Sequence, residues 1–172
     1  MGKQMTDVDD IEVKIVWRNC PADISDKIIE YWAEHNILSD PELVKNRLPT
    51  VVSIALHQGK VVGVLSAAIG RFFRDDLKFS FINASTAPDY RNRRVPVMLG
   101  EAAFDYLEGW SQENPAEGLV GVLYVLETNR FDHRGNIPYP GGGEYLAAFN
   151  KKNRPVFVKW FSHARVEPRP ND

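Results

Sequence analysis

Cysteine is nearly missing from this sequence, since Cys20 is the single cysteine in 172 residues. No disulfide can therefore form within the chain, and no group of cysteines and histidines has the spacing of a zinc site. This usage favours a reducing compartment, so we expect the protein in the cytoplasm. Long apolar runs are missing too, because no stretch approaches the ~20 apolar residues that cross a bilayer. The aspartate-rich beginning is unlike a secretory signal, and we expect no membrane partner.

Neither sign of charge dominates. The 21 Lys+Arg and 23 Asp+Glu residues give a formal net charge of −2, which disfavours a nucleic-acid partner held by general basicity. Hydrophobic residues make up 44% and charged residues 26% of the chain, as in a folded globular protein rather than a disordered one. The length suits one domain, so we expect a single domain over residues 1–172 with flexible tails at 1–10 and 166–172.

The spacing of apolar residues predicts alternating strands and helices. A period of two indicates strands, and recurrence at three and four positions indicates helices. The almost uniformly apolar stretch 119–126 predicts a strand that is buried on both faces, reached through a helix and parallel to the strand before that helix. The expected strands are 11–17, 51–57, 61–69, 77–86, 119–126 and 155–165, and the expected helices are 23–36, 41–48, 95–110 and a short one at 144–151.

A basic turn joins the third strand of this antiparallel meander to the long helix. The turn contains Arg91, Arg93 and Arg94, directly before the first residues of the expected helix. A helix N-terminus presents unpaired amides and partial positive charge, which favour an anion. Arginine side chains add donors that bind phosphate bidentately. The turn is thus a candidate phosphate site, and a solvated basic turn that pairs with nearby aspartates is the alternative.

The segment from residue 86 to residue 99 resembles the acyl-CoA-binding segment of the GCN5-related N-acetyltransferase (GNAT) superfamily, in which a strand ends in a pattern like V-x-P-x-Y-R-G-x-G-x-G-x-x-L. The positions that match in register are Pro88, Tyr90, Arg91, Arg93 and Leu99, and the glycine positions hold Asn92, Arg94 and Pro96. Two weaker similarities, the hairpin stretch 59–63 and the ending Val125-x-x-x-Asn129, extend the resemblance over residues 11–129.

The resemblance implies a GNAT-like acyl-CoA N-acyltransferase fold, with a mixed α/β sheet in which an antiparallel meander precedes a β-α-β parallel crossover. It implies acetyl-CoA as the acyl donor, no metal, and transfer of the acetyl group to a primary amine of a small molecule or peptide by direct attack. Ser85 and Thr86 would pair through their main chain with the pantetheine arm. The residues that the resemblance assigns to binding of the cofactor are Ser85, Thr86, Arg91, Asn92, Arg93, Arg94, Val95 and Asn129.

Three residues are candidates for the chemistry of such a transfer. Acyl transfer needs a base for the ammonium proton and an acid for the departing thiolate. Glu127, at the end of the expected buried strand, is the candidate base, directly or through a water, and an ordinary surface glutamate at a strand end is the alternative. Tyr145 is the first candidate for the acid and Tyr139 the second, although an ordinary packed or loop tyrosine is an alternative for each. His57 lies on an expected strand, where a lone histidine is more often structural than catalytic.

A second class of function stays open beside the enzyme. The altered glycine positions and the divergence after Asn129 also suit a non-catalytic binding or structural module with the same fold. In that case the glycine-rich aromatic stretch 139–145 and the last strand would form an interface, and an exposed edge strand leaves a homodimer open as the oligomeric state.

Overall fold

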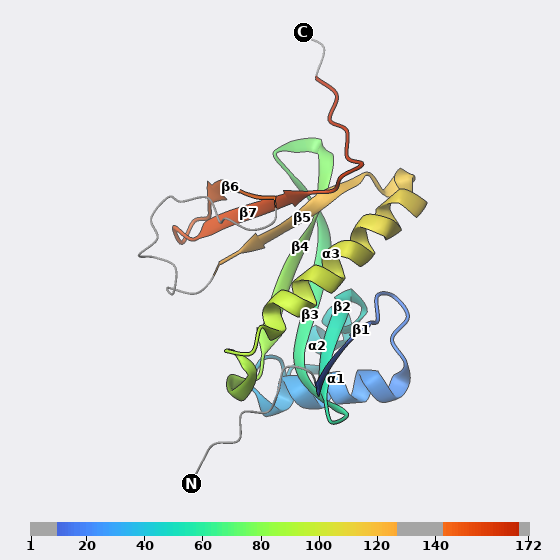
Figure 1. Ribbon diagram of the computed structural model, residues 1–172, viewed down its shortest axis with the longest axis vertical. Helices are drawn as coiled ribbons and strands as arrows, with labels where there is room; N and C mark the ends of the chain where they lie inside the picture. Colours follow the sequence, from blue (N-terminus) through green and yellow to red (C-terminus); the bar gives the residue numbers. More distant parts are fainter. Residues whose placement is uncertain (1–9, 127–142, 169–172) are drawn as a thin grey trace. The chain divides into compact units, whose positions relative to one another are not determined.

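The computed structural model describes residues 10–126 and 143–168 (Figure 1). The expected strands and helices up to residue 126 are confirmed, with ends that differ by a few residues. In chain order the elements are β1 (Ile11–Ile15), α1 (Ala22–Glu34), α2 (Pro41–Arg47), η2 (Leu48–Thr50), β2 (Val51–His57), β3 (Lys60–Phe72), β4 (Arg74–Thr86), η3 (Pro88–Tyr90), α3 (Val95–Glu113), η4 (Pro115–Glu117), β5 (Leu119–Val125), β6 (Glu144–Phe149) and β7 (Pro155–Trp160).

The chain forms two compact units. The first comprises Met1–Ala67 and Asn83–Tyr106, and the second comprises Ala68–Ile82 and Leu107–Asp172. Strands β3 and β4 and helix α3 each contribute residues to both units. The strands are hydrogen-bonded in the order β1-β2-β3-β4-β5-β7-β6, which gives a mixed sheet of seven strands among the described residues.

An antiparallel meander occupies the first unit. Strand β1 pairs with β2, where Ile11 lies opposite His57, and β2 pairs with β3 across the turn at residues 58 and 59. Gly59 has φ +77°, a conformation that glycine adopts without a steric penalty, and the expected glycine hairpin is confirmed.

The core of the first unit explains why α1 forms. Its apolar residues recur at three- and four-residue intervals and so share one helix face. This face packs with residues of β2 and β3 into one cluster of buried side chains. The members contributed by α1 are Ile24, Ile28, Tyr31 and Trp32, and those contributed by β2 and β3 are Val51, Ile54, Leu56, Val61 and Val64.

Close packing against β3 and β2 sets the beginning of α3. A Cβ atom at Gly63 would lie 2.8 Å from Cγ1 of Val95 and 3.0 Å from Cδ1 of Leu99, so a glycine is required for this approach. The buried hydroxyl of Ser53 donates a hydrogen bond of 3.0 Å to the carbonyl oxygen of Leu99. Because Val95 and Leu99 are fully buried, the first turn of α3 has a fixed position on the strands of its own unit.

The second unit contains the parallel pair of strands that the crossover joins. Strand β4 pairs in parallel with β5, where Phe81 lies opposite Leu123, and this confirms the expected parallel strand. Strands β5, β7 and β6 lie side by side and antiparallel (Figure 1). Leu77, Phe79 and Leu123 pack with residues of β7 in the core of this unit.

The expected helix at residues 144–151 is wrong, because β6 occupies Glu144–Phe149. A short apolar run suits either a helix or a strand, and its partners decide between them. Here the run pairs with β7 from Tyr145 opposite Val158 to Phe149 opposite Pro155. The turn between the two strands includes Asn153 at φ +57°, a conformation that asparagine tolerates better than most residues. Backbone pairing with β7 therefore outweighed any local tendency to form a helix.

Candidate functional site

The candidate site is the connection between the end of β4 and the beginning of α3, all within the first unit. The amide of Ala87 donates a hydrogen bond of 2.9 Å to the carbonyl of Val62 on β3, which anchors the chain as it leaves β4. The short helix η3 and the turn at residues 91–94 follow, and α3 begins at Val95. The sequence motif and the observed strand-to-helix junction therefore coincide.

Arg94 caps α3 in an unusual backbone conformation. Its carbonyl accepts the amides of Val97 at 2.9 Å and Met98 at 3.0 Å, so it holds the N-cap position. Its φ is +56°, in the left-handed region that favours glycine. Arg94 also occupies one of the three glycine positions of the GNAT pattern, so the chain keeps a glycine-like backbone there without a glycine.

The first turn of α3 has backbone amides that can donate hydrogen bonds to an anion. No described residue accepts a hydrogen bond from the amide of Arg94 or that of Val95. Pro96, the next residue, has no amide proton and contributes no donor. Unpaired amides at a helix N-terminus, together with the helix dipole, favour a phosphate or carboxylate.

Three guanidinium groups surround this turn. Arg91 is exposed, and its Nε donates a hydrogen bond of 3.4 Å to the carbonyl of Thr86 at the end of β4. The guanidinium of Arg93 lies over the ring of Tyr90 at 4.9 Å from its centroid, and Arg94 is exposed. The arrangement combines two free amides with concentrated positive charge, which suits a doubly charged ligand such as a pyrophosphate.

A buried histidine holds the tyrosine of this turn. The Tyr90 hydroxyl and Nδ1 of His57 are 2.7 Å apart, and the two rings lie with their centroids 5.5 Å apart. His57 ends β2 and is 7% exposed. The sequence predicted only a structural histidine on a strand. It did not predict the contact between His57 and Tyr90, which lie 33 positions apart.

Tyr31 on α1 reaches the end of β4. Its hydroxyl donates a hydrogen bond of 3.3 Å to Oγ of Ser85, which in turn donates one of 3.4 Å to the carbonyl of Val64. Burial raises the pKa of Tyr31, and the Ser85 hydrogen bond and the positive charge of Arg91 oppose this rise. The side chain of Ser85 is engaged inside the protein, so a ligand at this position would meet its main chain, as the resemblance implies.

The other predicted site residues are distributed unevenly. Most of the predicted cofactor-binding residues lie together, from the end of β4 through the following turn to the start of α3. They are Ser85, Thr86, Arg91, Asn92, Arg93, Arg94 and Val95. The hydroxyl of Thr86 is buried and has no hydrogen-bond partner among the described residues. Tyr145 lies on β6 in the second unit and is 62% exposed. Glu127, Asn129 and Tyr139 fall outside the described residues, so their roles stay predictions.

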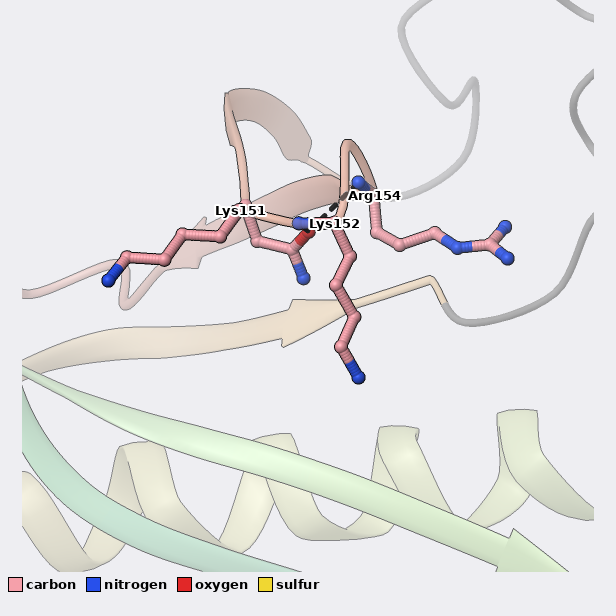
Figure 2. A pocket seen from close by; sticks show the side chains of 4 residues that line it. Lys151, Lys152 and Arg154 are labelled. Atoms are coloured by element: carbon pink, nitrogen blue, oxygen red, sulfur yellow. Dashed lines mark hydrogen bonds between the residues drawn. The ribbon is translucent and has the colours of Figure 1, made fainter.

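A second basic feature is the turn between β6 and β7, in the second unit. It borders a recess of about 470 Å³ lined by Asn150, Lys151, Lys152 and Arg154 (Figure 2). The Asn150 side chain accepts the amides of Lys152 and Arg154, each at 2.9 Å, and so braces the turn. Figure 2 shows the three cationic side chains extending in different directions, which suits general attraction of anions better than coordination of one group.

The described part of the chain also bears on metal ions and membranes as possible partners. Within it, no group of three or more histidine, cysteine, aspartate and glutamate residues has an arrangement that could hold a metal ion. No helix in these residues is both long enough and apolar enough to span a membrane.

Comparison with known proteins identifies the fold. No protein-family model matches the sequence, and no curated protein matches it. The loading GNATL domain of CurA from Lyngbya majuscula is similar in structure with a TM-score of 0.57 and 10% identity, over 90% of this chain and 99% of that one. A GNAT-family acetyltransferase from Streptococcus pneumoniae has a TM-score of 0.52 and 12% identity, over 88% and 99%.

A third similar structure was solved as a complex. NAA60 from Arabidopsis thaliana in complex with acetyl-CoA has a TM-score of 0.50 and 13% identity, over 88% of this chain and 98% of that one. Identities this low establish the fold alone. The expected GNAT-like architecture, with its meander and parallel crossover, is thus confirmed.

Proposed function

We propose that this protein is an acyl-CoA-dependent N-acyltransferase that takes the acetyl group of acetyl-CoA. The observation that carries the proposal is the turn before α3, where a glycine-like N-cap, two free amides and three arginines come together on a GNAT fold. Similar proteins are acetyltransferases, and one of them was solved with acetyl-CoA. The pyrophosphate of acetyl-CoA would occupy this turn.

Each part of the turn has a role in this proposal. The amides of Arg94 and Val95 would donate to phosphate oxygens, and the guanidinium groups of Arg91, Arg93 and Arg94 would neutralise the charge. The three arginines would offset the one amide donor that Pro96 removes from the turn.

The donor's pantetheine arm would extend along the end of β4. The main chain of Ser85 and Thr86 would pair with it as a further strand would, an arrangement consistent with the inward-facing hydroxyl of Ser85. Asn129 stays a predicted contact of the cofactor.

The chemistry would be direct attack by a primary amine of a small molecule or peptide. The amine nitrogen bonds to the thioester carbonyl carbon, the carbon–sulfur bond breaks, and the products are an amide and CoA. Glu127, directly or through water, would take the ammonium proton, and Tyr145 or Tyr139 would protonate the departing thiolate. These three roles and a cytoplasmic location are parts of the proposal.

A non-catalytic module with the same fold is the second candidate. Pro96 favours it, because a turn with fewer amide donors binds a phosphate less tightly. In this case acetyl-CoA binds weakly or not at all, and no amine is acetylated. An interface, including a homodimer, would then replace catalysis as the role of the fold.

Calorimetric titration with acetyl-CoA and CoA tests the first step. We expect saturable binding, which Arg91→Ala and Arg93→Ala each weaken about tenfold, the effect of ~1.4 kcal/mol in one charge-assisted contact. Arg71→Ala is the matched control, because Arg71 is exposed on β3 and the change removes the same charge. Absence of binding by the folded wild-type protein would refute the proposal.

Acetyl transfer then separates the enzyme from the module. Release of free CoA thiol is followed with panels of primary amines and of peptides, each at several concentrations. Amine-dependent release of CoA supports the enzyme, and Glu127→Gln should lower it without weakening acetyl-CoA binding. Absence of turnover by the folded protein on either panel would favour the module.

A further inference from the structure

His57 has an environment that separates it from an ordinary core histidine. It is the last residue of β2, its side chain is buried, and its Nδ1 lies 2.7 Å from the hydroxyl of Tyr90. Its other ring nitrogen, Nε2, is buried and has no partner among the described residues. Within the described chain, the imidazole therefore has one hydrogen-bond partner, which belongs to the turn before α3.

Tyr90 connects His57 to an arginine, because it contacts both side chains. The guanidinium of Arg93 lies over the Tyr90 ring, 4.9 Å from its centroid, and the Arg93 amide donates a hydrogen bond of 3.1 Å to the Tyr90 carbonyl. A cation over an aromatic face is held by the electrostatic attraction of the ring. The direction of the ring thus contributes to where the guanidinium lies.

Core packing and a hydrogen bond together hold the direction of that ring. Tyr90 is half-buried, follows a buried Ala87 on a short helical turn and packs against the core cluster of the first unit. The bond from its hydroxyl to a buried imidazole adds a directional contact to this packing, and so favours one rotamer of the ring. His57, Tyr90 and Arg93 then form a relay that runs from the core to the turn, entirely within the first unit.

We infer that His57 is a positioning residue for the phosphate-binding turn: through Tyr90 it holds the guanidinium of Arg93 ready for the ligand. This inference rests on the proposed function, since the ligand is the pyrophosphate of acetyl-CoA. Arginine has a large rotamer entropy, and a side chain that is ordered before binding loses less of it on binding. The contribution of His57 should therefore be seen in the affinity for acetyl-CoA.

Spectra of the ligand-free protein test the relay without reference to function. Protons above an aromatic face are shifted upfield, so the side-chain protons of Arg93 should have upfield NMR shifts in the wild-type protein. His57→Leu and Tyr90→Phe should both reduce these shifts, because each removes the hydrogen bond. His57→Asn should restore them in part, since its amide can occupy the place of Nδ1. Unchanged shifts in folded His57→Leu and Tyr90→Phe proteins would overturn the inference.

A double-mutant cycle with acetyl-CoA tests how the relay acts. His57→Leu should raise the dissociation constant three- to tenfold in the wild-type background and leave it nearly unchanged in the Arg93→Ala background, because the two residues act as one unit. His35→Leu is the control, since it makes the same change at a histidine whose ring packs against Tyr31 rather than Tyr90. An equal effect of His57→Leu in both backgrounds would overturn the inference.

The NMR measurement and the titration with acetyl-CoA distinguish failure of the relay from failure of the proposed function. If the upfield shifts of Arg93 are reduced in the His57→Leu and Tyr90→Phe variants but the wild-type protein does not bind acetyl-CoA, the relay is supported and the proposed function is refuted. If His57→Leu does not fold, Tyr90→Phe takes its place in both experiments, because it keeps the ring and removes only the hydroxyl.

Discussion

A glycine at position 94 should stabilise the protein more than an alanine there. Arg94 has φ +56°, and this conformation costs an L-residue about 1–2 kcal/mol relative to glycine. Glycine loses about 0.5–1 kcal/mol more chain entropy on folding. The difference predicts that Arg94→Gly is about 0.5–1 kcal/mol more stable than Arg94→Ala. Comparison of these two variants cancels the lost guanidinium, so it isolates the backbone.

The matched control is the same pair of substitutions three residues earlier. Arg91 has φ −60° and ψ −27°, an ordinary right-handed conformation, so glycine brings only its entropy cost there. Arg91→Gly should therefore be about 0.5–1 kcal/mol less stable than Arg91→Ala. The sign of the glycine-minus-alanine difference should reverse between the two positions, although both changes remove an arginine from the same turn.

Urea denaturation of the four variants measures these differences, with thermal unfolding as a second probe. In a chain of this size, ~1 kcal/mol corresponds to a shift of about 2–4 °C in the melting temperature. Equal slopes with urea are required, so that a midpoint shift reflects stability. If Arg94→Gly is no more stable than Arg94→Ala, Arg94 does not have the left-handed backbone on which the glycine-like N-cap depends.

Three other predictions concern the surroundings of the site and the braced turn. Gly63→Ala on β3 should destabilise the protein by about 1–3 kcal/mol in urea denaturation, because its Cβ meets Val95. Gly100→Ala in α3 has nothing within 4 Å of its Cβ and should stabilise the protein by about 0.5–1 kcal/mol. Asn150→Ala removes the acceptor of two backbone amides and should lower stability by about 1–2 kcal/mol, measured in the same assay. Burial raises the pKa of Tyr31 above 10.0, so the folded protein keeps a proton that the unfolded chain loses, and stability should fall as the pH rises through this value. Tyr31→Phe should flatten that fall in urea titrations at alkaline pH.

The fold was largely predictable because most of its elements have strong local patterns. The face of α1 recurs at helical spacing, and the apolar run of β5 has the composition of a strand buried between two others. The run at residues 144–149 was not predictable, since six residues of mixed character suit either structure. Pairing with β7 decided it, and this pairing is a contact that periodicity does not report.

The candidate site was predictable in place and only partly in geometry. The arginines of the turn lie where the motif puts them, directly before α3. The residue type gives no signal for the left-handed φ of Arg94, because arginine rarely adopts it, and only its place at a glycine position of the GNAT pattern points to it. His57 was also not predictable as a partner of Tyr90, because a lone histidine on a strand has many possible neighbours.

The sequence by itself determined the features that depend on neighbours along the chain. These are the order of most strands and helices, the glycine hairpin at residues 58–59, and the concentration of positive charge before α3. Each arises from residues a few positions apart, where backbone sterics and apolar spacing act directly.

Only the tertiary structure decided the contacts that give this turn its shape. Tyr31 meets Ser85 across 54 positions, and His57 meets Tyr90 across 33, because the packing of α1, β2 and β4 brings them together. The same holds for Gly63, whose missing side chain admits the first turn of α3. Such contacts depend on how buried surfaces fit one another, and many sequences with the same local pattern would fit them differently.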